Sequence, residues 1–152
     1  MEFIYSDGGR EAAGYKGHAS DCVLRAFCNC LDLNYAEMYA FFQHRMKTWA
    51  DTSRTRSAKL AKSRNQLSPR NGVSKQVYHK IFCDEFEMKW TPTMGIGTGC
   101  KVHLLSDELP SGNIIVRVSK HLTCVKDGML HDTYDCSREE TRCVYGYWEI
   151  NN

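Results

Sequence analysis

The sequence predicts an α+β fold in which N-terminal helices pack on a C-terminal antiparallel β-sheet. Apolar residues repeat with a helical period over about residues 21–86, and alternate with a period of two in most of the chain that follows. No helical segment separates the later strands, so the strand–helix alternation that builds a parallel sheet is missing. A chain of 152 residues is long enough for one core. We therefore expect residues 1–152 to form a single domain.

The helical half is expected to follow an opening strand and a glycine-rich loop. An apolar helix runs from Asp21 to Leu31, with Asp21 as its N-cap. A second helix starts near Asn34, and Glu37 stands three residues later, as in a capping box. A turn at residues 68–72 then leads to a third helix.

The strand half begins with a short candidate strand that ends at Pro92. A strong strand covers residues 113–119, two more flank the turn at Asp127, and residues 143–148 supply the last. The glycine-rich segment 95–99 is not followed by a helical pattern, so it does not predict a phosphate-binding loop. Consecutive strands of this kind favour an antiparallel sheet.

Composition and charge exclude several classes of protein. Apolar residues make up 42% of the chain and charged residues 25%, which excludes disorder, collagen and coiled coil. No apolar run approaches the ~20 residues of a membrane span, and the first residues lack the basic and hydrophobic regions of a secretion signal. A net charge of +2 does not indicate nucleic acid. We expect a cytoplasmic protein with no membrane or nucleic-acid partner.

The eight cysteines do not form a recognisable framework. A disulfide framework requires a secreted context, which the sequence does not indicate. Cys28 and Cys30 are separated by one residue, which is closer than the ligand pairs of zinc knuckles, and no second pair follows. We therefore expect most of the cysteines to be buried free thiols, and we expect neither a metal ion nor a cofactor.

Residues 45–70 form a strongly basic stretch in which Asp51 is the single acid. Such a stretch is typical of a solvated face or a mobile insertion. It could instead hold an acidic partner or the phosphates of a nucleic acid. No aromatic residue interleaves with the basic ones between Arg54 and Arg70, so a stacking platform for single-stranded nucleic acid is not supported. The candidate partner-binding residues are Arg54, Arg56, Lys59, Lys62 and Arg64.

The hairpin around the turn at Asp127 brings together two residues with catalytic potential. A two-residue turn there pairs Thr123 with Asp132, and alternate residues of a strand share a face. His121 is then the diagonal neighbour of Asp132, within side-chain reach, whereas Asp135 points to the other face. A carboxylate in this position can fix the tautomer of the imidazole and stabilise its protonated form.

Cys22 is the best placed of the cysteines to act as a nucleophile beside this pair. It stands at the predicted start of a helix, directly after a glycine-rich loop. The helix dipole and a neighbouring imidazolium both favour the thiolate, and the Cys22 backbone amide could donate to a developing oxyanion. The carboxylate of Asp21 opposes the thiolate by repulsion unless capping occupies it.

The order of these motifs resembles the papain-like cysteine peptidases, in particular the small bacterial and phage branch that includes bacteriocin-processing and cell-wall peptidases. The resemblance is carried by Asp21-Cys22 at the start of an apolar helix, by the hairpin His121-Leu122-Thr123-Cys124-Val125-Lys126-Asp127-Gly128-Met129-Leu130-His131-Asp132-Thr133, and by Tyr145-Gly146-Tyr147-Trp148 near the end.

This resemblance implies a papain-like thiol hydrolase, a peptidase or isopeptidase, that acts on a protein or peptide. For a phage-encoded protein the location would be the host cytoplasm. Cys22 would attack an acyl carbon, His121 would be general base and then acid, and Asp132 would orient His121. Deamidases and acyltransferases use the same triad. Lys16 stands where the family commonly has a Gln that donates to the oxyanion, and His18 or Ser20 would have to replace it.

Other interpretations of the same residues stay open. Cys22 could be an ordinary buried helix cysteine, and His121 could simply begin a strand. Asp132 could instead bond Thr123, its direct partner. The alternative function is a non-catalytic phage-type binding or inhibitor protein on the same scaffold, which would engage a host partner through residues 45–70.

Overall fold

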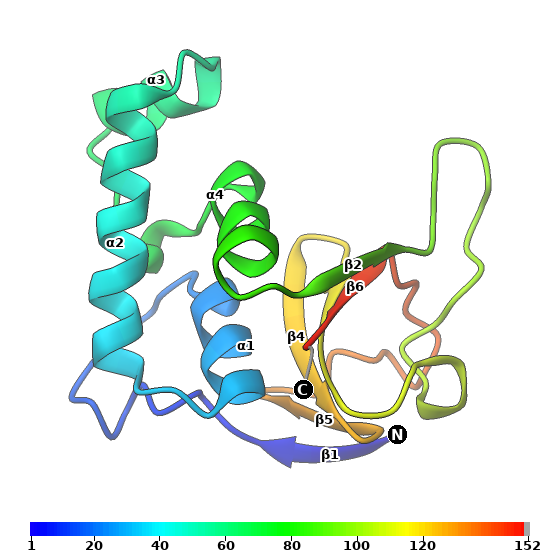
Figure 1. Cartoon of the computed structure of the whole chain (residues 1–152). Coiled ribbons are helices and arrows are strands. Elements are labelled where there is room, and N and C mark those ends of the chain that lie inside the picture. Colours follow the sequence, from blue (N-terminus) through cyan, green and yellow to red (C-terminus); the bar gives the residue numbers. More distant parts are fainter. Residues whose placement is uncertain (151–152) are drawn as a thin grey trace.

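The computed structural model describes residues 1–150, which contain four α-helices and a six-stranded β-sheet (Figure 1). This mixed α+β architecture confirms the predicted fold class at that level. The α-helices are α1 (Cys22–Leu31), α2 (Tyr35–Thr52), α3 (Arg56–Ser63) and α4 (Lys75–Lys80), which continues into a π-helical turn (Ile81–Glu85). The strands are β1 (Glu2–Tyr5), β2 (Lys89–Pro92), β3 (Asn113–Val118), β4 (His121–Lys126), β5 (Met129–Asp132) and β6 (Gly146–Glu149).

The strands lie in the order β1-β5-β4-β3-β6-β2. Every neighbouring pair is antiparallel except β1 and β5, which are parallel, so the prediction of a purely antiparallel sheet is wrong at this edge. The opening strand was predicted, but its partner is separated from it by more than 120 residues, and no local pattern specifies such a pairing. The hairpin register is confirmed, because Cys124 lies opposite His131. Asp127 and Gly128 both have positive φ angles, 48° and 79°, as a type I′ turn requires.

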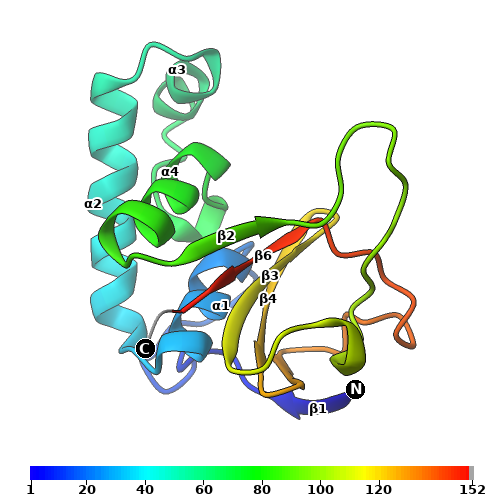
Figure 2. The same cartoon turned by 45° about the vertical axis from the view of Figure 1, so that its right-hand side comes forward.

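Helix α1 lies between α2 and the sheet, as both views show (Figures 1 and 2). Its Phe27 is fully buried, packs edge-to-face on Phe42 of α2 at a ring-centroid distance of 5.1 Å, and stacks on Phe82 at 5.6 Å. Leu122 and Cys124 of β4 belong to the same buried cluster. Burying a large apolar side chain contributes about 1.5–3 kcal/mol, so this cluster fixes α1 against β4.

The opposite face of the sheet has a second buried cluster, which is covered by segments that precede β3 and β6. Alternation along β4 and β5 places Val125 and Leu130 on this face, on the side predicted for His121 and Asp132. The buried members are Leu104, Ile114, Val116, Val118, Val125, Leu130, Cys136 and Val144.

The basic stretch at residues 45–70 contains a helix, α3, that was not predicted. Thr55 accepts a hydrogen bond from the Ala58 amide and caps it, and Ala58 is its one buried residue. The five candidate partner-binding residues are exposed, and Lys62 pairs with Asp51 at 2.8 Å. None of the helices in residues 1–150 is both long enough and apolar enough to cross a bilayer.

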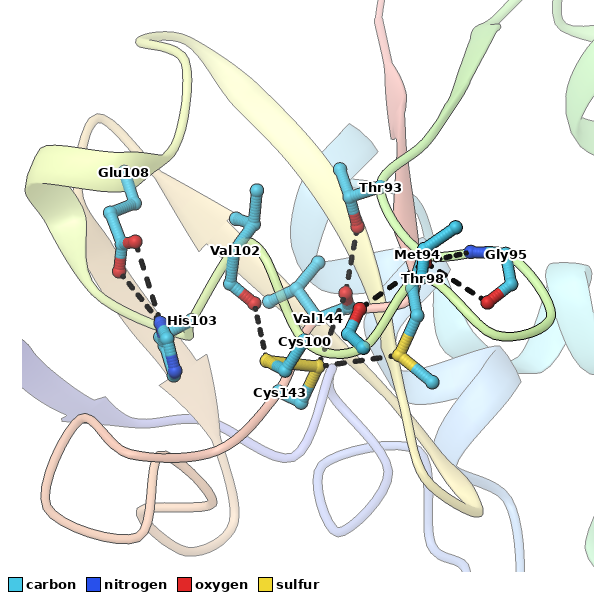
Figure 3. Close-up of a disulfide and its surroundings, with 11 residues drawn as sticks. Thr93, Met94, Gly95, Thr98, Cys100, Val102, His103, Glu108, Cys143 and Val144 are labelled. Atoms are coloured by element: carbon cyan, nitrogen blue, oxygen red, sulfur yellow. Dashed lines mark hydrogen bonds and ion pairs between the residues drawn. A yellow bond between two sulfur atoms is a disulfide. The ribbon is translucent and has the colours of Figure 1, made fainter.

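A disulfide joins Cys100 to Cys143, with their Cα atoms 5.8 Å apart, so these two cysteines are exceptions to the expectation that most of the cysteines are free thiols (Figure 3). It ties the long loop after β2 to the segment before β6. Thr93 Oγ1 also donates to the Val144 carbonyl at 2.7 Å. The two cysteines are 43 residues apart, so spacing alone could not have paired them. The expectation of buried free thiols holds for Cys28, Cys30, Cys124 and Cys136.

We expect Gly146→Ala to lower the free energy of unfolding by about 1–3 kcal/mol, the usual cost of overpacking. A Cβ atom on Gly146 would run into the Trp90 ring and come within 2.9 Å of the Thr91 carbonyl oxygen. Gly95→Ala is the matched control, because its Cβ would meet only Thr98 at 3.6 Å. Urea unfolding of both variants measures the difference. Equal midpoints would contradict this packing.

Candidate active site

The structure brings together the three residues predicted to form a catalytic cluster. Cys22 is the first residue of α1, His121 is the first of β4, and Asp132 is the last of β5. His121 Nε2 lies 2.7 Å from Asp132 Oδ2, and the Cys22 thiol interacts with the His121 imidazole. Because Nε2 faces the carboxylate, Nδ1 is the ring nitrogen left for the sulfur.

Two local features produce this convergence. The tight turn at Asp127 fixes the register of β4 and β5, so that the carboxylate of Asp132 reaches the imidazole from the neighbouring strand. The packing of α1 on β4 then sets the first residue of the helix beside the first residues of the strand, where the Leu122 backbone also helps to lower the pKa of the Cys22 thiol. Both features depend on residues distant in sequence from Cys22.

The carboxylate of Asp132 is only 4% exposed and is surrounded by donors. Besides His121, it accepts hydrogen bonds from Thr123 Oγ1 and the Thr133 amide, both at 2.7 Å, and from Cys136 Sγ at 3.7 Å. Burial acts to raise the pKa of Asp132, but the bonds from His121 and Thr123 outweigh it, and the pKa lies below its ordinary value. The two interpretations of Asp132, as a partner of His121 or of Thr123, therefore both hold.

Asp135, the rejected alternative to Asp132, bonds the Ser137 amide and hydroxyl instead of the imidazole. Tyr134 lies on the predicted side, with its ring centroid 5.4 Å from that of His121. The contact of Cys136 with Asp132 and His121 was not predicted, because Cys136 follows the strand and no register specifies its position.

The electrostatics of the site favour a thiolate–imidazolium pair. Burial acts to raise the pKa of the Cys22 thiol, but the His121 hydrogen bond, the Leu122 amide and the charges of His121 and Arg25 together lower it. Burial acts to lower the pKa of His121, and hydrogen bonds to Asp132, Cys136 and Cys22 raise it well above the ordinary value. The two shifts have opposite signs because each ion stabilises the other.

Asp21 occupies the N-cap position of α1, but its side chain makes no capping bond, which corrects its predicted role. Its carboxylate is 1% exposed, pairs with Arg25, lies 3.5 Å from Arg10 Nε, and accepts a hydrogen bond from Tyr35 at 2.6 Å. These partners offset the negative charge beside Cys22. The repulsion expected from Asp21 is thus reduced by ion pairing and not by capping.

The absence of a capping side chain leaves the first backbone amides of α1 available. Within residues 1–150, the amides of Cys22, Val23 and Leu24 have no hydrogen-bond partner. Amides at a helix N-terminus carry partial positive charge and bind anions. The start of α1 can therefore donate hydrogen bonds to an oxyanion that forms beside the thiol.

Cys22 and His121 line a cleft of about 340 Å³ together with Ser20. Lys16 and His18 line a different cavity, which also contains Asp21, so of the two predicted substitutes for the missing Gln only Ser20 shares the cleft with the thiol. Tyr78 was not predicted at this site, but it lines the cleft and interacts electrostatically with Cys22. The five candidate partner-binding residues do not line the cleft.

His121, Asp132 and Cys136 form the one cluster in the described chain whose ligand atoms lie close enough to share a metal ion, all within 4.8 Å. The same atoms already satisfy one another by hydrogen bonding.

No known protein family, curated protein or solved structure matches the chain. The chemistry of the site must therefore be argued from its geometry.

The lowered pKa of the Cys22 thiol predicts that Cys22 becomes reactive at lower pH than an ordinary cysteine. We expect iodoacetamide to alkylate Cys22 with a midpoint at lower pH than for Cys83, whose thiol pKa is raised chiefly by burial. Asp132→Asn should move the Cys22 midpoint to higher pH, because an imidazolium without its carboxylate loses its proton more easily and no longer stabilises the thiolate. Mass spectrometry of labelled peptides gives both midpoints, and a Cys22 midpoint at or above that of Cys83 would contradict the ion pair.

Proposed function

We propose that the protein is a papain-like thiol hydrolase, a peptidase or isopeptidase, in which Cys22 is the nucleophile, His121 the general base and acid, and Asp132 the orienting acid. One observation carries the proposal. A helix-terminal thiol with a lowered pKa interacts with an imidazole whose Nε2 atom lies 2.7 Å from a buried carboxylate. This combination of nucleophile, base and orienting group is the arrangement used for acyl transfer.

The order of elements supports the papain-like assignment. The thiol begins the first helix, the imidazole begins a later strand, and the carboxylate follows on the next strand of the same hairpin. The nucleophile and the base come from two elements that are far apart in sequence. They meet because the helix packs its apolar face on that hairpin.

The reaction would proceed in two steps. The Cys22 thiolate attacks the carbonyl carbon, the carbonyl electron pair moves to oxygen, and the free amides at the start of α1 bind the oxyanion. When the C–N bond breaks, the imidazolium of His121 protonates the leaving amine and a thioester remains on Cys22. His121 then removes a proton from water, which attacks the thioester and releases the acid and the thiolate.

Asp132 acts through His121. Its ionised carboxylate keeps the imidazole oriented with Nε2 toward Asp132, and its charge offsets that of the imidazolium in each step. Thr123 and the Thr133 amide hold the carboxylate in place. The same groups would serve deamidation, in which ammonia is the leaving group, or transfer to an acceptor other than water.

Acylation by p-nitrophenyl acetate tests this function without knowledge of the substrate. We expect a burst of one nitrophenolate per protein and an acetyl thioester on Cys22 that intact-mass analysis detects. Cys22→Ala should lose the burst, with a rate at least roughly a thousandfold lower. Cys83→Ala, which removes another half-buried thiol, should retain it. An unchanged burst in Cys22→Ala would overturn the proposal.

A second candidate function is a non-catalytic binding protein, and it is favoured by the exposed basic residues of the α2–α3 region. Within residues 1–150, Lys62 is the one member of the five candidates that has an ion-pair partner. Such a surface suits an acidic protein partner. The double substitution Arg54→Glu/Arg56→Glu would abolish partner capture under this function, whereas Cys22→Ala would leave it intact.

A further inference from the structure

The cleft beside the thiol is lined by cations and by no acid. Lys75 at the start of α4, Arg117 of β3 and Lys120 of the turn between β3 and β4 line it together with Cys22 and His121. Neither aspartate nor glutamate is among its lining residues. Two separate parts of the chain, the start of α4 and the β3–β4 hairpin, thus bring positive charge to the cleft that contains the reactive groups.

None of these three cations is neutralised within the described residues 1–150. No ion pair of Lys75, Arg117 or Lys120 occurs there, and the Arg117 guanidinium carbon lies 5.8 Å from the centre of the Tyr145 ring. The neighbouring cavity differs, because its Arg25 is paired with the buried Asp21. The cleft charges are therefore available to a ligand.

Lys120 is held in an unfavourable backbone conformation. Its φ angle is 57°, in the left-handed region that glycine and asparagine adopt more easily. A lysine at this position costs conformational energy and places a cation directly before His121. The tight turn that joins β3 to β4 holds the residue in this conformation, because Val118 pairs directly with His121.

We propose that the cleft selects acidic peptides, in which a carboxylate lies within one or two residues of the bond that Cys22 attacks. This inference rests on the proposed thiol-hydrolase function and assigns its substrate class. The substrate carboxylate would be attracted by Lys75, Arg117 and Lys120, which line the same cleft of about 340 Å³ as the thiol. Salt would weaken this attraction, because charges are screened over a Debye length of about 8 Å at physiological salt.

Competition between two small alkylating agents tests the charge selection. Iodoacetate and iodoacetamide place an anionic or a neutral group beside the same electrophilic carbon. The readout is the rate constant for iodoacetate at Cys22 divided by the rate constant for iodoacetamide. We expect a higher ratio at Cys22 than at Cys83. The ratio should fall about two- to fivefold for each of Lys75→Gln, Arg117→Gln and Lys120→Gln, and should also fall in 1 M salt.

Lys101→Gln is the matched control, because it removes one positive charge from an exposed residue outside the cleft and should leave the ratio unchanged. Lys75 and Lys120 are exposed, so their variants keep the fold and either one decides the test. Equal ratios in the wild type and these variants would overturn the inference while leaving a reactive Cys22. A Cys22 no more reactive than Cys83 toward either reagent would instead contradict the proposed function.

Peptide nitriles extend the test from free anions to peptides. The thiolate adds to the nitrile carbon and His121 protonates the nitrogen, which gives a reversible thioimidate. An inhibitor with Glu next to its nitrile-bearing residue should bind more tightly than the Gln analogue, and Lys75→Gln/Lys120→Gln should remove the difference. Preference for iodoacetate without preference for the Glu nitrile would overturn the assignment of an acidic peptide.

Discussion

The site depends on one interaction, the contact between the His121 imidazole and the buried carboxylate of Asp132 at 2.7 Å. A buried imidazolium is costly in free energy unless a negative charge lies beside it. Asp132 provides that charge, and donors from Thr123 and the Thr133 backbone keep it ionised despite burial. The protonated imidazole in turn lowers the pKa of the Cys22 thiol. The reactivity of Cys22 at the start of α1 thus depends on the β4–β5 hairpin, which carries His121 and Asp132.

A buried charge needs a partner of opposite charge, and this requirement also explains how the protein tolerates a second buried acid beside its thiol. Asp21 directly precedes Cys22 and is as buried as Asp132, yet its partners are Arg25, Arg10 and Tyr35. Because these groups occupy the carboxylate, its repulsion of the thiolate is reduced and it does not cap the helix. The uncapped amides remain free for an oxyanion, so the Asp21 ion pairs both offset a repulsion and leave the donors of α1 unoccupied.

Local sequence determines much of this arrangement, and long-range packing determines the rest. The turn at Asp127 has a strong backbone signature, so the register that joins His121 to Asp132 could be predicted from residues 121–132 alone. The start of α1 at Cys22 was predicted from the apolar pattern. The parallel pairing of β1 with β5 and the Cys100–Cys143 disulfide could not be predicted, since each joins segments far apart without a local pattern. The cationic lining of the cleft was missed for the same reason.

The central claim is a thiolate–imidazolium pair in the resting protein, and the NMR titration of the His121 ring tests it most directly. The account predicts that His121 stays protonated well above the ordinary histidine pKa, and that capping Cys22 as a neutral methyl disulfide lowers the His121 pKa because the thiolate is lost. A His121 that titrates at the ordinary value, and does so equally with Cys22 free or capped, would contradict the account.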